Sequence, residues 1–129
     1  MAEYIANVSQ EVQQNQDVLF TNAAIRGNNS IIHREGSGLV TLRGITNQCR
    51  ARYRVFFGGN IAIPTGGTVE AISLAIAING EAVGPATMIE TPAAVEEFSN
   101  VSASVFIDVP NGCCTTVSVT NTSTQTITV

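Results

Sequence analysis

The chain has 129 residues, the size of one domain with a single hydrophobic core, so we expect residues 1–129 to form one domain. The net charge of −4 argues against nucleic-acid binding, because a basic surface is needed to displace counterions from phosphates. No run approaches the roughly 20 apolar residues of a membrane span, and the first residues lack the basic and apolar regions of a secretory signal. We therefore expect a protein made in the cytoplasm, with no membrane span.

The composition favours strands over helices and burial against partners. Val, Ile and Thr are abundant, glycine and proline punctuate short runs, and no helical period is evident. Only 12% of residues are charged and 44% are hydrophobic, which predicts an oligomer. All six basic residues are arginines, which pair within interfaces more readily than lysines do.

The first half of the chain predicts short strands followed by one long strand. The short strands are expected at 4–8, 17–20, 31–34 and 39–42, with turns at 13–16, 26–29 and 35–38. The long strand is Cys49–Phe57, where residue type alternates with period two. Its core face is predicted to carry Ala51, Tyr53, Val55 and Phe57, and its other face Arg50, Arg52, Arg54 and Phe56. Gly58 and Gly59 predict a bend or bulge at its end, and 64–67 a turn.

The second half predicts a hairpin and a second long strand. Ala71–Ile78 leads into Asn79-Gly80, the pair that best accepts a type I′ turn. One face of this strand is large and apolar, and the other is small, which suits either the close approach of another layer or subunit or an alanine-rich solvent face. A shorter strand is expected at Thr87–Glu90, after Pro85, and a long one at Glu97–Val109. Strands at 114–119 and 125–129 follow.

Two aromatic residues interrupt the polar faces of the two long strands. Phe106 lies among Ser102, Ser104 and Asp108, just as Phe56 lies among arginines. Apolar anchors within a polar rim are typical of an interface. The alternative is that both phenylalanines are covered by loops of their own subunit.

Three cysteines leave at least one thiol unpaired within the chain or paired with another chain. Cys49, Cys113 and Cys114 are either reduced and packed, or form a disulfide within or between chains. A metal site is a poor interpretation, because His33 has no partner motif.

Enzymatic motifs are weak, and we expect neither an enzyme nor a cofactor. No nucleophile signature accompanies His33. Glu96 and Glu97 are adjacent and diverge on an extended segment, which does not suit paired catalytic carboxylates.

The strand pattern resembles the C1q/TNF-like jelly roll, especially its bacterial and phage members such as the heads of collagen-like spore-surface glycoproteins. The resemblance covers Tyr4–Val119 and is carried by Asp17–Asn22, Ile31–Arg34, Gly38–Leu42, Arg52–Phe57 and Ser73–Gly80. It implies an all-β, antiparallel jelly-roll sandwich of two sheets and a homotrimer packed through the sheet that contains the terminal strands. Phe56 and Phe106 would then make apolar contacts at the interface, where Arg50, Arg52 and Arg54 would pair with Glu97 or Asp108 rather than bind a polyanion.

The chain departs from this family in three places. It has no Gly-x-y stalk, it has Ile45–Cys49 in place of the usual glycine-aromatic approach to the long strand, and it reaches Val129 before the usual final strand. Three explanations for the absence of that final strand stay open: the fold ends early, a C-terminal segment exists in the natural gene, or a neighbouring chain supplies the strand.

Together these observations favour a non-enzymatic structural protein that forms trimers on an extracellular particle. We expect a phage virion protein, either a head decoration or a fibre head, with itself and a capsid lattice as partners. One alternative is a module that binds a carbohydrate, such as a host glycan, or a host-surface protein. Another is a bacterial spore or appendage subunit cross-linked through its cysteines.

Overall fold

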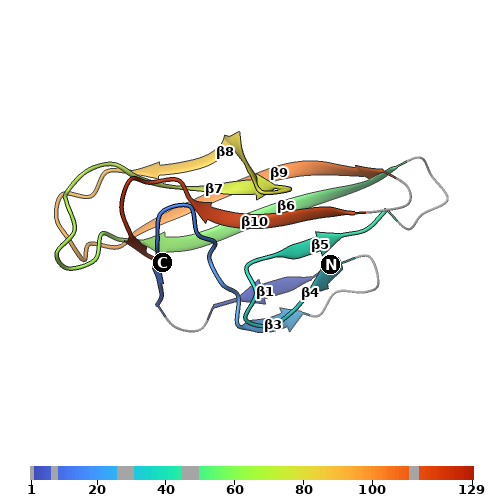
Figure 1. The fold of residues 1–129 in the computed structure, drawn as a ribbon, viewed down its shortest axis with the longest axis horizontal. Coiled ribbons are helices and arrows are strands. Elements are labelled where there is room, and N and C mark those ends of the chain that lie inside the picture. The colour runs from blue at the N-terminus through green and yellow to red at the C-terminus, as the bar shows by residue number, and fades with distance from the viewer. Residues whose placement is uncertain (1, 7–8, 26–30, 45–49, 111–113) are drawn as a thin grey trace.

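The computed structural model describes residues 2–6, 9–25, 31–44, 50–110 and 114–129 (Figure 1). This part of the chain contains no helix, which confirms the predicted all-β class. Its strands are β1 (Glu3–Ile5), β2 (Glu11–Val12), β3 (Asn22–Ile25), β4 (Ile31–His33), β5 (Val40–Leu42), β6 (Arg50–Ile61), β7 (Ile72–Ile78), β8 (Glu81–Glu90), β9 (Ser99–Pro110), β10 (Thr115–Asn121) and β11 (Ile127–Thr128).

The largest sheet has five strands in the order β4-β5-β10-β7-β8, all antiparallel to their neighbours. The two longest strands, β6 and β9, form a separate antiparallel pair. β1 pairs with β3 and β11 with β2. A single bridge between Ala62 and Thr128 links β11 to the end of β6.

One apolar core joins the five-stranded sheet to the β6–β9 pair, which gives a sandwich-like arrangement. The fully buried side chains come mostly from β6, β7, β9 and β11; they include Ile61, Ile72, Leu74, Ile76, Val109 and Ile127. The loops at 62–71 and 91–98 gather at one end of the molecule, on the left in Figure 1.

The β7–β8 hairpin confirms the Asn79-Gly80 turn and corrects the expectation for Pro85. Asn79 and Gly80 have φ of 53° and 84°, the two positive angles of a type I′ turn. β8 continues through Pro85, although we expected a strand only after it. The β7–β8 register shifts between Ala75 and Ala77, so residues 83–86 bulge out of the ladder. Proline is tolerated there because a bulge needs no ladder hydrogen bond from it.

The predicted bulge at Gly58 and Gly59 is wrong, because both residues stay in register with β9. The rings of Phe56 and Phe57 explain the glycines. A Cβ on Gly58 would lie 3.3 Å from Phe56, and one on Gly59 would lie 3.0 Å from Phe57. Each glycine therefore makes room on the strand for the aromatic side chain two residues earlier.

The small face of β7 is covered within the single chain. Ala75 and Ala77 are buried, which rules out the alanine-rich solvent face. Ser73 is hydrogen-bonded to Ser123 and Thr122. Close approach of another layer of the same chain is therefore the correct one of the two interpretations.

The predicted strand at 17–20 is replaced by isolated bridges, and the short β2 and β3 were not anticipated. Asp17 bridges Thr120, and Phe20 bridges Ser37. Between them, the Gln10 amide donates to the Leu19 carbonyl and accepts from the Leu19 N–H, both at 2.9 Å. A side chain thus satisfies the backbone groups that a neighbouring strand would otherwise satisfy.

Candidate self-association surface

The β6–β9 pair positions the predicted interface residues. The two strands run in register from Arg50 opposite Pro110 to Ile61 opposite Ser99, with no bulge. Successive side chains therefore point alternately toward the core and away from it. We call the side turned away from the core the outer β6–β9 face; its exposed residues include Arg52, Arg54, Phe56, Ser102, Ser104, Phe106 and Asp108.

Phe56 and Phe106 are the large apolar residues that this face exposes. Their side chains are 65% and 68% exposed, so the alternative that loops of the same chain cover them is wrong. Phe106 lies opposite Arg54 and Phe56 opposite Ser104, which makes the two phenylalanines diagonal neighbours in the ladder. Aromatic rings at diagonal positions are within reach of each other. The Phe56 ring, however, lies beside Gly58, on the side away from Arg54 and Phe106. The face therefore presents two exposed aromatic side chains inside a polar surround.

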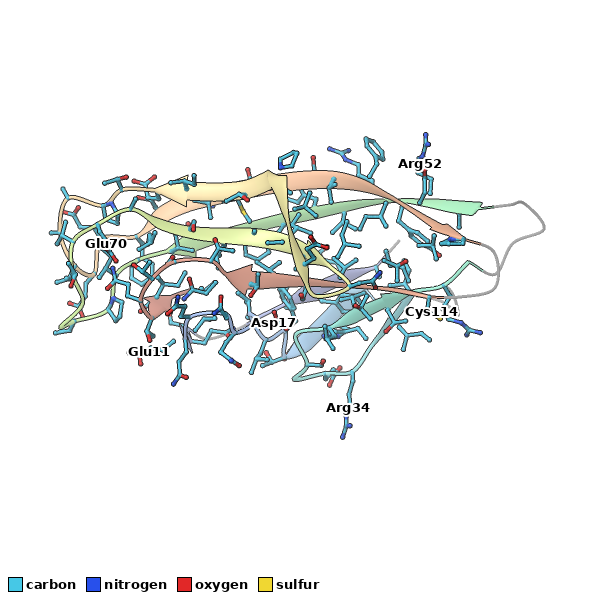
Figure 2. The ribbon with its side chains drawn as sticks, turned by 45° about the horizontal axis from the view of Figure 1, so that its top comes forward. Glu11, Asp17, Arg34, Arg52, Glu70 and Cys114 are labelled. Atoms are coloured by element: carbon cyan, nitrogen blue, oxygen red, sulfur yellow. The ribbon has the colours of Figure 1, made fainter. Side chains whose placement is uncertain are left out.

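Arg52 and Asp108 form a two-pronged ion pair on the same face. Arg52 Nε donates to Asp108 Oδ1 at 2.8 Å, and Arg52 Nη2 donates to Oδ2 at 3.2 Å. The two residues are opposite each other in the ladder, so the strand register holds the pair together. The hydrogen bond and charge of Asp108 raise the pKa of Arg52. The ion pair lies within one chain, and Arg52 projects away from the ribbon in Figure 2.

The other predicted charges are not paired in this way in the described part of the chain. Arg54 is exposed next to Phe106, and Glu97 is exposed ahead of β9. The side chain of Arg50 lies outside the described residues, although its backbone begins β6. The structure thus brings together Arg52, Phe56, Phe106 and Asp108 of the predicted set.

A side chain on the inward side of β6 is hydrogen-bonded to the chain segment that precedes the strand. Tyr53 donates its hydroxyl hydrogen to the carbonyl of Arg43 at 2.7 Å. This bond crosses from near the start of β6 to the residue that follows β5. It fixes the facing of β6, which in turn fixes the orientation of Phe56 and Arg52.

Cys114, just before β10, is disulfide-bonded. Cys49 and Cys113 lie outside the described residues.

His33 has a structural role in β4. Its Nε2 lies 2.9 Å from the Ser37 carbonyl, and its ring is tilted against Tyr4 with centroids 4.3 Å apart. The ring also meets Phe20 edge-on. His33 therefore packs as an ordinary strand residue does.

A shallow polar depression of about 400 Å³ lies at the loop end of the molecule. Much of its polarity is already used: the Gln125 amide accepts from the Thr68 N–H and donates to the Thr68 carbonyl, and Thr65 bonds Glu96. The lining residues are Glu11, Pro64, Thr65, Gly66, Gly67, Thr68, Gln125 and Thr126. None is aromatic, so the depression offers no ring on which a sugar could stack.

Two features escaped the sequence prediction. Ile89 on β8 is 67% exposed; the alternation with buried Met88 is the signal that could have placed it outward. The second is the edge of β6 away from β9, which is hydrogen-bonded only near its end in the part of the chain that the structure describes. No local pattern reports strand pairing of that kind.

No protein-family model and no curated protein matches this chain. In the residues that the structure describes, there is no helix long and apolar enough to cross a membrane.

Proposed function

We propose that this protein is a non-enzymatic structural protein that assembles as a homotrimer through the outer β6–β9 face. The observation that carries the proposal is the exposure of both Phe56 and Phe106 on one face, within a polar surround. Burying a phenylalanine side chain contributes about 1.5–3 kcal/mol. Aromatic residues ringed by polar groups are the usual anchors of protein interfaces.

The Arg52–Asp108 pair suits the rim of such an interface. Because it is already formed within one chain, it brings little uncompensated charge to the contact. The carboxylate also offsets the charge of the guanidinium, which weakens its attraction to a polyanion, in keeping with the net charge of −4.

We further propose that the chain is a jelly roll of the C1q/TNF-like kind. The strand order supports this: from β5 to β7, and again from β8 to β11, the chain alternates between the five-stranded sheet and the strands opposite it. Strands that alternate between two layers are the hallmark of a jelly roll. A second layer in the order β2-β11-β6-β9 would follow if the Ala62–Thr128 bridge is counted as pairing.

The particle that we propose is a phage virion, with the trimer as a head decoration or fibre head. The resemblance to phage and spore-surface jelly rolls and the low charged fraction support this assignment. Mass spectrometry of purified virions should detect the chain at a stoichiometry fixed to the capsid protein. Its absence from particles that are otherwise complete would contradict the assignment.

The interface proposal is tested by two matched substitutions. Phe56→Asp should convert the trimer to folded monomers, because an interfacial anchor contributes about 2 kcal/mol or more. Phe98→Asp is the control, since Phe98 is also exposed but lies outside the outer β6–β9 face. Sedimentation velocity should show dissociation only for Phe56→Asp. Equal behaviour of the two variants would overturn the interface.

A carbohydrate- or host-surface-binding module is the second candidate. The polar depression at the loop end is where a ligand would bind, through hydrogen bonds and without stacking on an aromatic ring. Binding on a glycan array that is lost on Gln125→Ala would support this candidate. The third candidate is an appendage subunit cross-linked through cysteines; Cys114 is disulfide-bonded in the structure.

A further inference from the structure

The β6 strand is hydrogen-bonded very differently along its two edges. One edge pairs with β9 over all 12 residues of the strand. On the other edge, the only pairing in the described part of the chain follows its last residue. There the N–H and C=O of Ala62 both bond Thr128, at 2.9 Å each.

The parity of the strand identifies the groups on this second edge. In an antiparallel ladder, every second residue turns its N–H and C=O to the same side. Ala62 turns both to Thr128, and the β6–β9 register has no bulge, so Asn60, Gly58, Phe56, Arg54 and Arg52 turn theirs the same way. None of these five has a backbone partner on that side among the described residues.

The burial of the inward side chains falls off along the same edge. Ile61 and Phe57, near Thr128, are 0% and 8% exposed. Farther from Thr128, Tyr53 and Val55 are only partly buried. Opposite Tyr53, however, Ile107 on β9 is 4% exposed. Val105, opposite Val55, is partly buried as Val55 is, so the two edges differ in burial at the Tyr53–Ile107 position.

We propose that the free edge of β6 is an acceptor site for an extended segment of another polypeptide. The segment lies antiparallel to β6, in line with β11, and bonds the N–H and C=O groups of Arg52, Arg54 and Phe56. Its side chains opposite Tyr53 and Val55 pack against these partly buried residues and are apolar. The residue between them lies opposite Arg54 on the outer face and is acidic, since Arg54 has no ion pair in the described structure.

β9 has a free outer edge too in the described part of the chain, but it does not offer the same site. Ile107 and Val109 are already buried, so an added strand beside them would cover only the partly buried Val105 and Ala103. The β6 edge offers backbone partners, an uncovered part of the core and an arginine without an ion pair among the described residues. These three features select the segment by chemistry: apolar, acidic, apolar, in an extended run.

The probe is a synthetic peptide of about nine residues, a typical long-strand length, with Val at alternate positions and Glu at the position facing Arg54. Amide hydrogen exchange of the native protein is followed by NMR with and without this peptide. The peptide should slow exchange at Arg52, Arg54 and Phe56 by at least about tenfold. Exchange at Ala51, Tyr53 and Val55 should change little, because those amides already bond β9.

Two controls distinguish backbone pairing from nonspecific binding of the peptide. A peptide of the same composition with its alternation broken should leave exchange unchanged. Arg54→Pro removes both the side chain and an edge N–H, whereas Arg54→Ala removes only the side chain. Proline is tolerated where the N–H has no ladder partner, so Arg54→Pro should fold and bind the peptide more weakly than Arg54→Ala does.

Three results would overturn the proposal. The first is no slowing of exchange at the edge amides in the native protein. The second is equal slowing by the scrambled peptide. The third is protection of these amides without peptide that grows with protein concentration, because a second copy would then be the occupant. Peptide binding that persists in the Phe56→Asp monomer would show that the acceptor site does not depend on the proposed trimer.

Discussion

Asn121 is a fully buried polar residue whose amide joins three parts of the chain. Its Nδ2 donates to the carbonyls of Val12 and Gln125 at 2.8 and 2.9 Å, and its Oδ1 accepts from the Ser123 N–H at 2.8 Å. Asn121→Ala would leave these groups without partners in the core, so it should lower the free energy of unfolding by about 2–4 kcal/mol. Urea denaturation measures this loss. The exposed Thr122→Ala is the control, and equal effects of the two variants would contradict this role.

Asp17 makes the stability of the fold depend on pH through a single residue. Partial burial raises its pKa above the ordinary value of 3.8, against the opposing hydrogen bonds from Ser118 and Thr120. The folded state therefore binds the proton more tightly than the unfolded state, and stability is lost as pH rises from 3.8 through the raised pKa. Asp17→Asn should be more stable than the native protein near neutral pH, with the difference shrinking below pH 3.8. Thermal unfolding across this range tests it; a constant difference would contradict it.

At the scale of elements, the β7–β8 hairpin depends on backbone conformation rather than on space. A Cβ added to Gly80 or to Gly84 would meet nothing within 4 Å, but only Gly80 has a positive φ, of 84°. Gly80→Ala should therefore lower the free energy of unfolding by about 1–2 kcal/mol, and Gly84→Ala should leave it nearly unchanged or raise it slightly. Chemical denaturation of the two variants makes the comparison. Equal losses would show that the turn angle is not what matters.

The same element scale shows which features the sequence could predict. The Asn79-Gly80 turn and the facing of Phe56 and Phe106 follow from neighbouring residues, so they were predictable. Three other features could not be predicted in this way. They are the regular pairing of β6 through Gly58, the continuation of β8 through Pro85 and the absence of a strand at 17–20. Each depends on something outside its own segment: an aromatic ring, a bulge against β7, or the Gln10 amide. The open edge of β6 is likewise a matter of pairing between distant strands.

At the scale of the whole molecule, the disulfide of Cys114 stabilises the fold from one end of β10. Cys114→Ser should lower the free energy of unfolding by about 2–4 kcal/mol, since a cross-link restricts the unfolded chain. A non-reducing gel of the native protein should show single chains, because the disulfide is formed within one chain. A ladder of covalent oligomers that disappears on reduction would contradict this and favour the cross-linked appendage.

The proposed assembly would depend on two long strands whose apolar residues lie on both faces. The inward face builds the core, while the outward face leaves Phe56 and Phe106 in water in the single chain. A solitary protein gains nothing from that exposure, whereas a trimer would bury it.

Light scattering coupled to size-exclusion chromatography of the native protein tests trimer formation most directly. At micromolar concentration, we expect a molar mass of about three times the 13.5 kDa chain. A folded, soluble species at the mass of one chain would contradict it.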